Sequence, residues 1–170
     1  LKLGVCLEGE GGGEWLISVS GGQFSVEQGA CDAAVLTLVQ SVDDWRGALW
    51  EGQGGEFGRQ AAALFAGGAD SDSGQPLQLG ALSALSELEG LIRIRVTEAE
   101  RGDWTTGFKL GQGAIPAEPT TEIEMTAEDA RALQDGTLDP MQAFMSGKIR
   151  VTGDMALMMQ LQAVLMAAGS

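Results

Sequence analysis

The stretch TTEIEMTAEDARALQDGTLDPMQAFMSGKIRVTGDMALMMQLQAVL, residues 120–165, carries the patterns that decide the fold. Apolar and charged side chains alternate near its start, which predicts a strand over 121–125. Thr126 is followed three residues later by Asp129, which resembles a capping box with Asp in place of the usual Glu. We therefore expect a helix that starts at Thr126 and ends before Gly136.

The second part of the same stretch predicts three more elements. A proline stands at the start of a helical turn over 139–145, a position that proline favours. A Ser-Gly break follows, and the residues 148–152 predict a strand. Asp154 is placed to cap a last helix over 155–168, which is almost entirely apolar.

Further elements are expected on the N-terminal side of this stretch. The residues 91–96 and 104–110 predict two strands, and the first of them alternates apolar residues with arginines. Leucines spaced by three over 79–88 predict a short amphipathic helix. The residues 69–78 are rich in Gly, Ser and Asp and contain a proline, which is typical of a linker.

The first half of the chain predicts a similar order of elements. A Gly-Gly pair between two alternating runs is a hairpin signal. Ser41 and the two aspartates after it favour the start of a helix that runs to about Trp50. The extended segments expected before this helix cover 4–7, 15–19, 24–26 and 34–39.

Both halves thus predict a strand–strand–strand–helix unit, with Trp15 corresponding to Trp104. We interpret this as a divergent internal duplication. The predicted organisation is a degenerate repeat over 1–68, a linker over 69–78 and a ligand-binding domain over 79–170.

The order of short motifs over 120–165 resembles the sterol carrier protein 2 family. The resemblance extends more weakly back to Leu91, and more weakly still to the residues 28–52. The motifs that carry it are Asp135-Gly136, Asp139-Pro140, Ala143-Phe144, Gly147-Lys148 and Gly153-Asp154, followed by the Met- and Leu-rich helix.

This resemblance implies an α+β fold. It implies a five-stranded, largely antiparallel sheet with helices on one face and an apolar tunnel between them, walled by the last helix. Members of the family bind sterols, fatty acids or other lipids with little selectivity.

The amino-acid composition limits the classes of binding partner that the chain could have. The chain has 24 acidic and 10 basic residues, a net charge of −14, which argues against nucleic acid as a partner and against strong attraction to an anionic membrane. Transient membrane contact and a homodimer stay open. The Gly- and Ala-rich composition, without a visible signal peptide or membrane span, predicts a bacterial cytoplasmic protein.

Catalytic chemistry is not expected. There is no His and no Tyr, so a Ser-His-Asp triad or a Cys-His pair cannot form, and no metal site or cofactor motif stands out. We predict that Cys6 and Cys31 are buried small apolar residues, although the sequence leaves a bridge between them open.

The distribution of methionines indicates which residues could bind a ligand. Six of the seven methionines lie between Met141 and Met166, and methionine suits surfaces that adapt to varied apolar ligands. Any one of them could instead be ordinary core. The expected ligand-binding set is Trp104, Phe108, Met125, Met141, Phe144, Met145, Ile149, Met155, Met158, Leu161 and Leu165.

The sequence thus predicts non-covalent binding or transfer of a lipid or another apolar small molecule, without enzymatic activity. The alternative is a structural or dimerisation module that keeps the fold without a ligand cavity.

Overall fold

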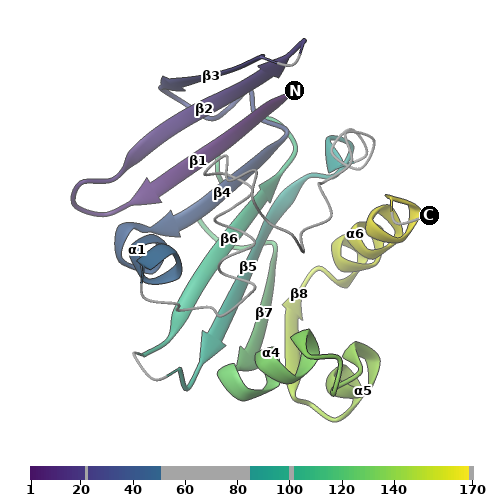
Figure 1. Cartoon of the computed structure of the whole chain (residues 1–170). Helices are drawn as coiled ribbons and strands as arrows, with labels where there is room; N and C mark the ends of the chain where they lie inside the picture. The colour runs from purple at the N-terminus through teal and green to yellow at the C-terminus, as the bar shows by residue number, and fades with distance from the viewer. Residues whose placement is uncertain (22, 51–84, 100–101, 169–170) are drawn as a thin grey trace.

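The computed structural model describes residues 1–21, 23–50, 85–99 and 102–168. Within this part of the chain, eight strands form one mixed sheet in the order β3-β2-β1-β4-β6-β5-β7-β8 (Figure 1). The strands are β1 (Lys2–Glu8), β2 (Gly13–Ser20), β3 (Gln23–Gln28), β4 (Leu36–Ser41), β5 (Gly90–Thr97), β6 (Trp104–Leu110), β7 (Thr121–Thr126) and β8 (Ile149–Gly153). The helices are α1 (Val42–Trp50), α4 (Ala127–Gln134), α5 (Pro140–Met145) and α6 (Met155–Ala168).

The helices begin where the sequence predicts them. The Thr126 hydroxyl accepts a hydrogen bond from the Asp129 amide at 3.1 Å and so caps α4. Asp139 caps α5 through the Gln142 amide. Asp154 accepts from the first-turn amides of α6, one of them at 2.8 Å. The linker predicted over 69–78 lies outside the described residues, as does most of the helix predicted over 79–88.

Both halves of the sheet repeat one arrangement. β1 pairs antiparallel with β2 and parallel with β4, and α1 follows β4. In the same way, β5 pairs antiparallel with β6 and parallel with β7, and α4 follows β7. The topology therefore agrees with a duplication, although descent of the first half from a second copy stays a prediction.

The sheet is wider than the five strands that the family resemblance implies. β4 and β6 pair antiparallel, with Leu36 opposite Leu110 and Val39 opposite Gly107, and this pairing joins the halves. The strand that follows β6 in the chain, β7, pairs with β5 and not with β6, so one edge of β6 is left open within its own half. The free edge of β6 is filled by β4 instead. The division of the chain into two domains stays a prediction.

The two faces of the sheet differ in polarity. One face is apolar, and α1, α4 and α6 pack against its large side chains. The other carries Arg93 and Arg95 on β5 and Glu122 and Glu124 on β7. The α+β class with helices on one face is thus confirmed. Among the described residues, no helix is long and apolar enough to cross a membrane.

Candidate functional site

A continuous apolar cluster covers the face of the sheet on which the helices lie. Alternate residues of each strand point to this face, so β1, β4, β5 and β6 each contribute side chains to it. Several large members are only half-buried, among them Trp15 and Phe108. Its fully buried members are Val5, Leu36, Leu38, Leu85, Leu88, Ile92, Leu110 and Leu157.

Helix α6 lies over this cluster with one of its sides. Leu157 is buried, and Met158, Leu161 and Val164 are half-buried against the cluster. A glycine makes this approach possible, because a Cβ on Gly90 would lie 2.8 Å from Cδ2 of Leu157. The position of α6 is therefore fixed by contact with the end of β5.

Three predicted ligand-binding residues come together in this cluster. Phe108 on β6 and Met158 and Leu161 on α6 all pack against it. Phe108 lies 50 residues before Met158 in the chain, so only the fold brings it into one cluster with α6. These three residues are therefore the part of the predicted set that lies against one apolar cluster.

Two other predicted residues lie in a neighbouring cluster on the same face. Trp104 is fully buried beside Ala48 and Val96, and Met125 packs against them. The Trp104 indole donates a hydrogen bond to the Asp44 carbonyl at 3.0 Å, which ties β6 to the first turn of α1. Burial also raises the pKa of the Asp44 carboxyl, which accepts a hydrogen bond from the Ser41 hydroxyl at 2.8 Å.

The remaining predicted residues whose side chains the structure describes do not join either cluster. Ile149 on β8 is half-buried, and the side chain of Leu165 lies outside the described residues. The exposed members of the predicted set are Met141, Phe144, Met145 and Met155. Ligand-binding roles for all eleven residues stay predictions.

The opposite face holds a polar hollow that the sequence reasoning missed. Its volume is about 330 Å³, at the lower end for small-molecule sites. Its charged lining consists of Glu8, Asp44 and Glu122 with Arg93 and Arg95. Because acids outnumber bases and apolar walls are few, this hollow does not suit a lipid chain or an anion.

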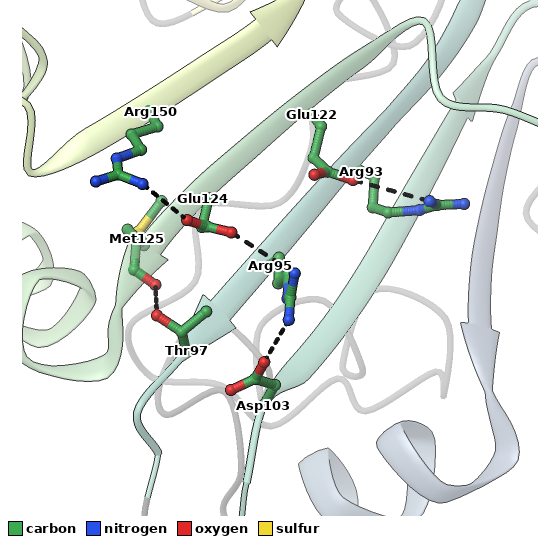
Figure 2. Close-up of polar contacts among 8 residues, drawn as sticks. All are labelled: Arg93, Arg95, Thr97, Asp103, Glu122, Glu124, Met125 and Arg150. Carbon is green, nitrogen blue, oxygen red and sulfur yellow. Dashed lines mark hydrogen bonds and ion pairs between the residues drawn. The ribbon is translucent and has the colours of Figure 1, made fainter.

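An ion-pair ladder runs along this polar face (Figure 2). Arg95 approaches Asp103 at 2.6 Å and Glu124 at 3.7 Å, and Glu124 also lies 3.8 Å from Arg150. Because these side chains are partly exposed, solvent screens the pairs and they contribute little to stability. The signal for this ladder was present in the sequence as alternating arginines in one strand and alternating glutamates in another.

Metal-binding geometry is not found in the part of the chain that the structure describes, since no three Cys, Asp or Glu side chains gather there into a possible metal site.

Comparison with known proteins identifies the second half of the chain. Residues 75–166 match the model of the SCP-2 sterol transfer family. The chain belongs to this family. The matched range covers β5 to most of α6, which includes Phe108, Met158 and Leu161. It does not include the first half, so a divergent N-terminal copy is not confirmed by this comparison.

Relatives of this SCP-2 family chain are longer proteins. It is 36% identical over 116 residues to human stomatin-like protein 1, covering 59% of this chain and 29% of that protein. It is 28% identical over 93 residues to human sterol carrier protein 2, covering 51% of this chain and 17% of that one. The chain thus spans less than a third of these relatives.

Among solved structures, the chain is similar to palmitated SCP2L2 from Aedes aegypti. The identity is 21%, the TM-score is 0.40, and the similarity covers 64% of this chain and 89% of that one.

Proposed function

We propose that this chain binds a lipid or another apolar small molecule non-covalently, on the apolar face of the sheet beneath α6. The observation that carries the proposal is the position of α6, which lays Met158 and Leu161 over that face within the half that matches the sterol transfer family. Support also comes from Phe108, a large side chain that is only half-buried there.

Binding on such a surface needs no specific polar contact. Each CH₂ group moved from water to an apolar environment contributes about 0.8 kcal/mol. A long acyl chain therefore binds by burial alone, and we expect poor selectivity among ligands. Palmitate is a suitable first ligand, because the similar Aedes aegypti protein is described as palmitated.

The first prediction concerns two side chains on the inner side of α6. We expect the protein, freed of lipid, to bind a fluorescent fatty acid and a fluorescent sterol saturably. Changing Met158→Gln together with Leu161→Gln should weaken this binding by roughly tenfold or more, because polar amides replace apolar contacts. Fluorescence titration measures both affinities, and palmitate should displace the probes.

The matched control is Met159→Gln, since Met159 lies on the same helix but is 70% exposed. This variant should bind the fatty acid as the parent does. If the folded parent protein shows no saturable binding to either probe, the lipid-binding proposal is wrong. A structural module that keeps the fold without a ligand cavity would then be favoured.

The proposal carries three finer points that rest on the sequence. The ligand leaves chemically unchanged, so the protein is not an enzyme. It acts in the cytoplasm of a bacterium. It meets a membrane only briefly, when ligand is exchanged.

A further inference from the structure

Helices α5 and α6 expose large apolar side chains to solvent. Three lie on α5: Met141 is 60% exposed, Phe144 43% and Met145 80%. Two lie on α6: Met155 is 44% exposed and Met159 70%. We call these five residues the methionine surface. Each of the two helices that flank β8 thus exposes apolar side chains, and exposed apolar patches mark interaction sites.

The spacing of these residues gives each helix an outward apolar side. Met141, Phe144 and Met145 are three and four positions apart and so share one side of α5, while Ala143 is fully buried on another. Met155 and Met159 are four positions apart on α6. Figure 1 shows both helices beside β8, at the edge of the sheet opposite β3.

Charge separates this region from the rest of the chain. The residues 138–168 contain two acids, Asp139 and Asp154, and two bases, Lys148 and Arg150, so their net charge is zero. The whole net charge of −14 therefore lies elsewhere in the sequence. An anionic surface would repel most of the molecule but not this region. The region matches a partner that is apolar and carries no net charge.

We propose that the methionine surface docks on a lipid bilayer with electrically neutral head groups. This inference rests on the proposed function, because α6 then contacts the bilayer with Met155 and Met159 and the apolar face of the sheet with Met158 and Leu161. A lipid that moves between the two passes along one helix. Methionine suits this contact, since its flexible side chain adapts to fluid acyl chains.

The test is flotation of the full chain, without added ligand, with phosphatidylcholine vesicles. We expect the parent protein to float, and the triple variant Met141→Gln, Met145→Gln and Met159→Gln to partition at least roughly tenfold less. Replacing part of the phosphatidylcholine with phosphatidylserine should reduce flotation of the parent, because the chain is strongly acidic.

Val26→Ser is the matched control. Val26 is 55% exposed on β3, at the other edge of the sheet, so this variant should float like the parent. The single variants Met145→Gln and Met159→Gln keep the test valid if the triple variant fails to fold, as each should reduce flotation on its own. Thermal unfolding confirms that each variant is folded.

Three outcomes would overturn the proposal. The parent could fail to float at any lipid concentration, or the folded triple variant could float like the parent. Light scattering could instead show a dimeric parent and a monomeric triple variant, which would assign the surface to a second copy of the chain. Because the assay contains no ligand, its failure is distinguishable from failure of fatty acid binding.

Discussion

Cys6 and Cys31 show how single residues are held on the polar side of the sheet. Both are buried and neither is in a disulfide, so the predicted burial is confirmed and the bridge that the sequence left open is absent. The Cys31 thiol lies 3.2 Å from the Trp15 carbonyl, to which it donates. Gly4 leaves the space for it, because a Cβ there would lie 2.8 Å from the Cβ of Cys31.

Thiol reactivity gives a prediction at this scale. Burial, with a smaller contribution from the Glu14 carboxylate, raises the pKa of Cys6 from 9.0 to about 11, and burial also raises that of Cys31. The reactive thiolates are therefore scarce at pH 8. We expect iodoacetamide to modify both residues much more slowly in the native protein than in urea, as measured by mass spectrometry over time.

The same shift sets a pH dependence. The unfolded thiol ionises near its ordinary pKa of 9.0, whereas the folded thiol of Cys6 ionises near 11. Its contribution to stability is thus complete below pH 9 and is lost as the pH rises toward 11. If iodoacetamide modified Cys6 and Cys31 as fast in the native protein as in urea, this result would contradict the burial of the two thiols.

Helix α4 shows what local sequence does and does not predict about an element. The cap formed by Thr126 and Asp129 was predicted from their spacing, and it is confirmed. Lys148 also contacts this cap, and the local spacing of residues did not predict that contact. Its ammonium donates to Asp129 at 2.7 Å and lowers the pKa of that carboxyl. This contact depends on the path of α5, which no local pattern specifies.

Loss of the cap gives a prediction for the element. Thr126→Ala removes the acceptor for the Asp129 amide and should lower the free energy of unfolding by about 1 kcal/mol. Urea unfolding measures the change. Thr126→Ser retains the hydroxyl and should stay within a few tenths of a kcal/mol of the parent. Equal losses in the two variants would show that the methyl group, and not the cap, is important.

The candidate site was predictable only in part, for a reason that lies in how helices pack. The sequence showed that α5 and α6 are rich in methionine, but it did not show which side of each helix packs against the rest of the protein. Met158 and Leu161 face the cluster, whereas Met141 and Met145 face solvent, since α5 buries only Ala143. A helix that is apolar on several sides gives no periodic signal for the side that packs.

At the scale of the whole molecule, the unpredicted feature is the join between the halves. Every described strand was expected near its observed position, because alternation and turn residues are local signals. The pairing of β4 with β6 links residues about seventy positions apart. It depends on which strand edges remain free after each half has formed, and sequence periodicity carries no information about that.

The pairing of β4 with β6 affects whether the part of the chain that matches the family can fold without the first half. A fragment of residues 79–170 would lose β4, and the β6 edge that now pairs with Leu36 to Val39 would be left without hydrogen-bond partners. Open edges recruit strands from other chains. We expect the fragment to self-associate with rising concentration in sedimentation experiments, where the full chain does not. A monodisperse fragment that melts like the full chain would contradict this.

The pairing of β4 with β6 therefore places one strand of the sheet around the matched half outside the residues that match the family. The match to the family model begins at residue 75, but the backbone hydrogen bonds that complete the sheet of the matched half come from residues 36–39. We therefore expect the unit that folds on its own to be longer than the unit that the family model matches.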